Sequence, residues 1–162
     1  MEEESKLEKF KKDYEVLRAK HGLPEFNKMN EDFQIEKISE NETDILIREV
    51  RKFVGDKIVN YMRFVESLLN PVNAPMFTLS LVKLLGAEER SKLQGIYKDL
   101  MRKEVSFIER DIQFDEVKEA EFIRDSFKLW QEIKKDLALV MGKVDRKWDE
   151  EKIAIDSNGY FG

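Results

Sequence analysis

The residues with the clearest potential for chemistry are two carboxylates three positions apart, Glu116 and Glu119. On a helix this spacing places both side chains on one face, and carboxylate oxygens are ligands that Mg²⁺ accepts readily. An all-carboxylate Mg²⁺ site is therefore one hypothesis for the chain. The alternative is a chance occurrence, because the sequence holds 34 Asp and Glu residues and the pattern is short.

This carboxylate pair resembles one half of the metal site of all-helical nucleoside-triphosphate pyrophosphatases, in which a Glu-x-x-Glu is followed by a Glu-x-x-Asp. The second half is not matched, because Glu132 and Asp136 are one residue too far apart. The resemblance covers one tetrapeptide. It implies a Mg²⁺-dependent nucleotide hydrolase that uses helix-borne carboxylates, and we keep this as the third of three functional hypotheses.

Other common chemistries lack the residues that they need. The chain has no cysteine, which excludes disulfides, thiolate zinc sites and iron–sulfur clusters. The one histidine, His21, precedes the helix-ending Gly22, so we expect it to stabilise a helix C-terminus. Gly142-Lys143 lacks the earlier glycine of a phosphate-binding loop. We therefore assign no catalytic residue, no metal ligand and no cofactor.

Five charged residues fall on predicted apolar helix faces: Lys57, Glu104, Asp111, Glu119 and Lys134. A buried ion is costly unless it is paired, because each charge loses several kcal/mol of hydration. Three interpretations remain open. The lysines can extend along the apolar surface to reach water while Asp111 lies beyond the packed region. Lys57 and Glu104 can form a buried structural pair, or Lys57, Glu104 and Glu119 can form a functional polar pocket.

Basic residues cluster on two predicted helices and give the second functional hypothesis, a nucleic-acid-associated factor. The candidate phosphate contacts are Arg48, Arg51, Lys52, Lys98, Arg102 and Lys103. The competing interpretation is a solvated face paired with nearby Glu and Asp. The net charge of −5 favours the latter, since nucleic-acid-binding domains are usually basic.

Apolar residues recur at helical spacing along most of the chain, which predicts an all-α fold. We expect helices over about 3–20, 42–69, 74–85, 87–112 and 115–150, with a further short helix within 24–32. Ser39, Asn41 and Thr43 are candidate N-caps for the second long segment. The segment 74–85 is apolar nearly all round and should be buried. These elements predict an irregular antiparallel bundle of about five helices, with long second and last helices.

The last predicted helix carries an apolar row from Ala120 to Trp148 at a mean spacing close to 3.5 residues, as in a coiled coil. It would span roughly 50 Å at 1.5 Å per residue, so it must bend, break at Gly142 or project. Trp130, Val144 and Trp148 are candidate interface residues, although Trp148 can equally close the end of the bundle. Our first functional hypothesis is thus a non-enzymatic protein–protein interaction or assembly protein, which binds a protein partner or itself.

Length and composition favour one domain in a reducing compartment. We expect a bundle over 1–151 and a flexible tail over 152–162. The N-terminus is charged and no apolar run reaches about 20 residues, which argues against a signal peptide or a membrane span and favours a cytoplasmic protein. Charged residues make up 39% of the chain, and abundant Glu and Lys without Cys resemble thermophile usage.

Several segments give a wider resemblance. They are His21-Gly22-Leu23-Pro24-Glu25-Phe26, Tyr97-Lys98-Asp99-Leu100-Met101 and Glu119-Ala120-Glu121-Phe122-Ile123, followed by Trp130 and Lys134. Their order resembles small uncharacterised all-helical proteins of archaea. The resemblance implies an all-helical fold and an archaeal origin, and it implies no activity, cofactor or functional residue.

Overall fold

The computed structural model describes residues 5–158, and side chains as far as Glu151. Seven helical elements account for most of the described chain, and no strand occurs among them, so the all-α class is confirmed. They are α1 (Lys6–His21), α2 (Phe26–Phe33), the 3-10 helix η1 (Ile35–Glu40), α3 (Leu46–Leu69), α4 (Met76–Val82), α5 (Ala87–Ile112) and α6 (Glu116–Asn158). No helix in this part of the chain is long and apolar enough to cross a membrane.

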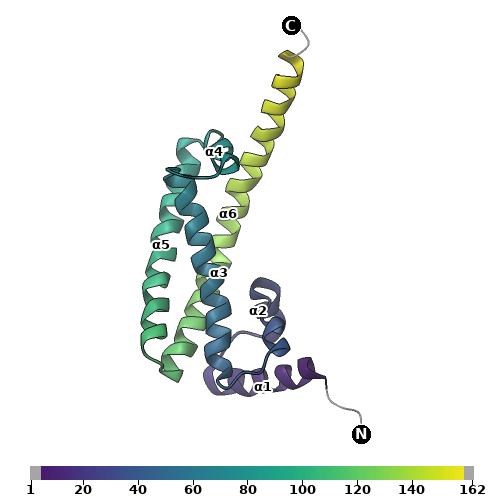
Figure 1. The fold of residues 1–162 in the computed structure, drawn as a ribbon, viewed down its shortest axis with the longest axis vertical. Coiled ribbons are helices and arrows are strands. Elements are labelled where there is room, and N and C mark those ends of the chain that lie inside the picture. Colours follow the sequence, from purple (N-terminus) through teal and green to yellow (C-terminus); the bar gives the residue numbers. More distant parts are fainter. Residues whose placement is uncertain (1–4, 159–162) are drawn as a thin grey trace.

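Three long helices, α3, α5 and α6, lie side by side and form a core that we call the three-helix core (Figure 1). In the figure α5 runs opposite to α3 and α6, and a short connection over 113–115 joins α5 to α6. Each helix contributes a buried apolar stripe, for example Val54, Ile58 and Val65 of α3, Leu93 and Leu100 of α5, and Ile123 and Val140 of α6. Burying each such side chain stabilises the fold by about 1.5–3 kcal/mol.

The N-terminal elements pack at the end where α3 begins (Figure 1). Gly22 ends α1 in the left-handed conformation at φ 65°, as its position before Pro24 predicts. The hydroxyl of Tyr14 then donates to the Pro24 carbonyl oxygen at 2.7 Å. Its ring meets Phe26 edge-on at 5.7 Å between centroids. This aromatic contact fixes α2 against α1 and brings Asp32, near the end of α2, to α3 and α6.

Two helix starts agree with the sequence, at Gly86 before α5 and at Asp115 before α6. The boundaries of α5 match the predicted 87–112, and Asp115 caps α6 by accepting from the Lys118 amide at 3.0 Å. The predicted start of the second long helix was wrong: α3 begins at Leu46, after Ile45, with no side-chain cap. Residues 41–45 are all exposed, so no apolar face is available there to stabilise a helix.

The last helix is longer than predicted and projects. Its 43 residues span roughly 64 Å, and Figure 1 shows its C-terminal part extending beyond every other element. It continues through Gly142 and past the predicted boundary at residue 151 to Asn158. Of the predicted tail 152–162, residues 152–158 are therefore helical, and 159–162 lie outside the described residues.

Candidate functional site

The five charged residues predicted on apolar faces do not form one cluster. Glu119 and Asp111 belong to the first of two groups, in which Arg51 lies between them. Arg51 Nε donates to Glu119 Oε2 at 2.6 Å, and its Nη1 donates to Asp111 Oδ1 at 2.7 Å. Arg51 and Glu119 are both buried, while Asp111 is half exposed. Arg51 was predicted as a nucleic-acid contact, and this burial makes that prediction wrong.

An aromatic ring completes the surroundings of Arg51. Its guanidinium lies 5.0 Å from the centroid of the Phe107 ring. Gly55, one turn along α3, allows this approach, because a Cβ at this position would overlap the ring. Burial raises the pKa of Glu119, and the hydrogen bond and charge of Arg51 only partly oppose this effect. The group thus has the character of a structural ion pair that joins α3, α5 and α6.

Lys57 and Lys134 form the second group around Asp32. Lys57 donates to the backbone carbonyl oxygen of Asp32, and Lys134 Nζ lies 3.1 Å from Asp32 Oδ1. The Lys57 ammonium also lies 4.8 Å from the Trp130 ring centroid. Burial lowers the pKa of Lys57, Asp32 opposes this shift and Lys134 adds to it. The predicted pairing of Lys57 with Glu104 was therefore wrong, and the predicted pocket of Lys57, Glu104 and Glu119 is not assembled.

The carboxylate pair of the metal hypothesis is held by two different sets of cations. Glu116 Oε1 lies 2.7 Å from both Lys20 Nζ and His21 Nε2. These contacts, with Lys20 foremost, lower the pKa of Glu116. Glu119 instead binds Arg51 in the core. Within the described residues no group of three or more acidic or histidine side chains is placed to hold a metal ion.

Most of the predicted nucleic-acid contacts are engaged within the fold. Arg48 lies over the Phe114 ring at 4.7 Å, and Lys52 pairs with Glu49 at 3.2 Å. Lys103 lies near Asp125 and the Phe122 ring. Lys98 and Arg102 are exposed on α5. The basic residues that are close in sequence thus point to different partners.

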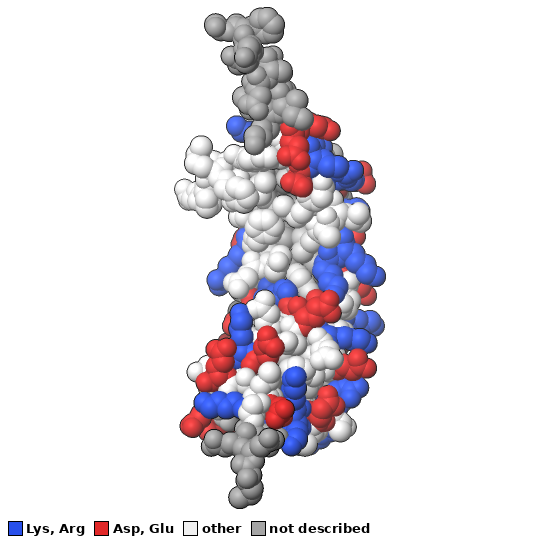
Figure 2. Space-filling model, turned by 90° about the vertical axis from the view of Figure 1, so that its right-hand side faces the viewer, with Lys and Arg blue, Asp and Glu red and all other residues white. Residues whose placement is uncertain are grey.

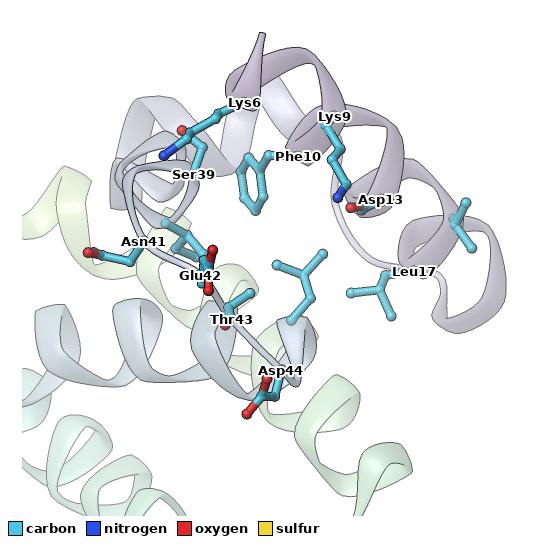
Figure 3. A pocket seen from close by; sticks show the side chains of 13 residues that line it. Lys6, Lys9, Phe10, Asp13, Leu17, Ser39, Asn41, Glu42, Thr43 and Asp44 are labelled. Carbon is cyan, nitrogen blue, oxygen red and sulfur yellow. The ribbon is translucent and has the colours of Figure 1, made fainter. Parts of the chain in front are cut away.

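An open pocket of about 760 Å³ lies between α1 and the segment that leads into α3. Figure 3 shows Lys6, Lys9 and Leu17 on the α1 side and Glu42 and Asp44 on the opposite side. Its polar side chains lie at the rim and are mostly exposed. Catalytic groups usually lie in partly desolvated surroundings. The charged side chains that line this pocket are all exposed, so it offers a solvated rim around an apolar floor.

The least expected feature is an apolar surface at the opposite end. Residues 67–82 include no Asp, Glu, Lys or Arg, although such residues make up 39% of the chain. Within this run Val72 is exposed, Met76 is 79% exposed and Phe77 is 65% exposed. Trp148 of α6 is 39% exposed and its ring lies 6.5 Å from that of Phe77. We call Val72, Met76, Phe77 and Trp148 the apolar tip.

Figure 2 shows this region as an uncharged knob at the height of α4, above a surface where both charge signs alternate. The prediction that segment 74–85 is buried all round was therefore wrong for its first turn. Thr78 and Leu81 face inward, whereas Met76 and Phe77 do not. The reason is that α4 has only seven residues, packs mainly against α3 and turns its first residues away from it.

The predicted interface residues have different environments. Trp130 and Val144 are buried in the core, so their assignment to an interface was wrong, and only Trp148 remains accessible. Two functional candidates were missed by sequence reasoning. Asp32 gave no signal, because its partners are distant in sequence, whereas the uncharged run around Phe77 was visible and was interpreted as a buried helix.

Comparisons with known proteins add no functional assignment: no family model, curated protein or solved structure matches the chain.

Proposed function

We propose that the chain is an irregular antiparallel helical bundle without enzymatic activity, which binds another protein through the apolar tip and the projecting end of α6. The observation that carries this proposal is the exposure of Met76 and Phe77 within an uncharged run of a highly charged chain. Isolated apolar residues are normal on a surface, but a contiguous group is typical of an interaction site.

The residue types of the tip also favour protein binding. Phe, Trp and Met are enriched at protein interfaces, and aromatic side chains dominate their binding energy. Phe77 and Trp148 are already in ring contact at 6.5 Å, so little side-chain freedom is lost when a partner covers them. The tip is therefore a preorganised anchor.

The charges beside the tip indicate the chemistry of the partner. Asp149, Glu150 and Glu151 follow Trp148 and are exposed on the part of α6 that leaves the three-helix core. Lys147 is turned back, because its ammonium donates to the Leu84 carbonyl oxygen at 3.0 Å. A partner with an apolar groove and a Lys- or Arg-rich rim fits this arrangement, as in recognition of a helix by a groove.

Photo-crosslinking in cells that naturally make the protein tests this proposal. A photoreactive residue replaces Met76, and a matched one replaces Leu139, which is 56% exposed on α6. Leu139 lies nine residues before Trp148 and so on the opposite side of the helix. We expect one dominant protein adduct from position 76 and none from position 139.

Two variants establish whether the adduct depends on the tip. Phe77→Glu should reduce its yield roughly thirtyfold, the equivalent of losing one anchor side chain, and Glu150→Lys should reduce it further. Leu139→Glu should have no effect. Equal adducts from both positions, an adduct that is insensitive to Phe77→Glu, or binding of the tip to lipid vesicles or oligonucleotides instead of protein would overturn the proposal.

A further inference from the structure

A second exposed apolar surface lies on α5 and is independent of the tip. Met101, Val105, Ile108 and Ile112 are between 43% and 80% exposed. They are separated by four, three and four residues, which is the spacing of the core positions in a coiled coil. We call these four residues the α5 row.

The α5 row is not the face that builds the core. The buried residues of α5 are Glu89, Leu93, Ile96 and Leu100. At 100° per residue they lie about a third of a turn from the row. The side of α5 between the two faces contains Asp111 and Tyr97, which bind Arg51 and Glu66 of α3. The row therefore borders α3 and remains uncovered, on the helix that forms one edge of the molecule in Figure 1.

We propose that the α5 row is a self-association surface, on which a second copy of this chain packs its own α5 in antiparallel orientation. The charges on the free side of the row, which faces away from α3, favour a second copy of the chain as the partner. Arg102 and Glu109 lie on this side, seven residues apart, and carry opposite charges. Arg102 is exposed, and the nearest cation to Glu109 is its neighbour Arg110 at the long distance of 3.8 Å.

The twofold axis of an antiparallel helix pair brings the same side of both helices together and reverses their direction. Arg102 of one copy then faces Glu109 of the second copy, and the reverse pair forms at the other end. A parallel pair would instead place this side against the side of Glu104 and Asp111. That side faces α3, where Asp111 binds Arg51, so only the antiparallel pair makes the contacts between Arg102 of one copy and Glu109 of the other.

The size of the surface indicates a weak dimer. The row occupies twelve of the 26 residues of α5, and a standard interface buries about 800 Å² on each partner. Exposed Phe114 and Val117 extend the apolar surface beyond the end of α5. We therefore expect a dissociation constant in the micromolar range.

Analytical ultracentrifugation of the full chain over the micromolar concentration range tests the proposal. The wild-type protein should shift from monomer to dimer, whereas Ile108→Glu should remain monomeric. Leu139→Glu, which places the same charge at an equally exposed position of α6, should dimerise as the wild type does. Because Ile108 is half exposed, the variant should keep its helical circular dichroism and melting temperature.

Charge reversal tests the antiparallel orientation itself. Arg102→Glu and Glu109→Arg should each weaken the dimer about tenfold, because each replaces two attractive contacts by repulsive ones. The double variant should regain the wild-type dissociation constant. A wild-type protein that stays monomeric, a dimer that survives Ile108→Glu, or a double variant that is no better than the single ones would overturn the proposal. A dimer lost through Phe77→Glu instead would assign self-association to the apolar tip.

Discussion

Replacing Arg51 by methionine should remove a large part of the stability of the fold. Arg51 Nε and Glu119 Oε2 are 2.6 Å apart and both side chains are buried. At an effective dielectric constant of about 20, two unit charges at this distance attract by roughly 6 kcal/mol. The loss of hydration of both ions offsets most of this attraction, so the intact pair contributes little net stability.

The single variant does not simply lose that small net contribution. Arg51→Met removes the attraction and leaves Glu119 without its counter-ion in the core, which typically costs about 3–5 kcal/mol. A domain of this kind has a free energy of unfolding of about 5–15 kcal/mol. The melting temperature should therefore fall by roughly 6–20 °C, at about 2–4 °C per kcal/mol for a chain of this length.

Thermal unfolding followed by circular dichroism at neutral and at mildly acidic pH gives the assay. The pKa of Glu119 is raised in the folded state, so the folded protein binds more protons than the unfolded one between the two pKa values. The contribution of Glu119 to stability is then present below the unfolded pKa and is lost as pH rises through the folded pKa. Without Arg51 the folded pKa rises further, so the loss of stability should be smaller at acidic than at neutral pH.

Two further variants separate the buried pair from a general effect of charge. Lys52→Met removes a neighbouring cation that pairs with Glu49 at the surface, and it should change stability by less than about 0.5 kcal/mol. The double variant Arg51→Met, Glu119→Leu should recover the wild-type stability or exceed it, as buried pairs replaced by apolar residues often do. A cost below about 1 kcal/mol for Arg51→Met, or a double variant as unstable as the sum of both single ones, would refute the reasoning.

Two further predictions concern neighbouring contacts. Gly55→Ala should destabilise the protein by about 1–3 kcal/mol, because the added Cβ would overlap the Phe107 ring. Gly95→Ala is the control: its added Cβ meets open space, and it should stabilise the protein by about 0.5–1 kcal/mol. Urea unfolding measures both free energies. Lys20→Met should raise the pKa of Glu116 toward its ordinary value, because the contact with Lys20 is the main cause of the lowered pKa. An NMR titration that follows the carboxyl carbon of Glu116 measures this pKa. An unchanged pKa would contradict the assigned contact.

The sequence predicted elements well where local signals define them. Gly22 before Pro24 and the Gly86 boundary fix the end of α1 and the start of α5, because glycine ends or begins a helix through its own backbone. The start of α3 was predicted too early because a capping side chain does not by itself stabilise a helical turn that buries no apolar face. Asn41 and Thr43 have suitable side chains, but residues 41–45 are all exposed and bury no apolar face.

The candidate site could not be predicted in the same way. A helical projection identifies Lys57 and Glu119 as charges on apolar faces, but it does not show which residue of a neighbouring helix each of them contacts. Their partners are 25 residues away for Lys57 and 68 for Glu119, so they depend on how α2, α3 and α6 are arranged. Arg51 was grouped with Arg48 and Lys52 for the same reason, since sequence shows only its neighbours along the chain.

The two proposed surfaces are compatible and separable. The apolar tip lies where α5 begins, and the α5 row occupies its second half. An antiparallel pair of α5 helices would therefore place the two tips at opposite ends of the dimer, where each remains free to bind a partner. Phe77→Glu should then weaken partner binding roughly thirtyfold and preserve the dimer, while Ile108→Glu should remove the dimer and preserve partner binding. If one substitution removed both properties, the tip and the row would be parts of a single interface, and the antiparallel arrangement would be wrong.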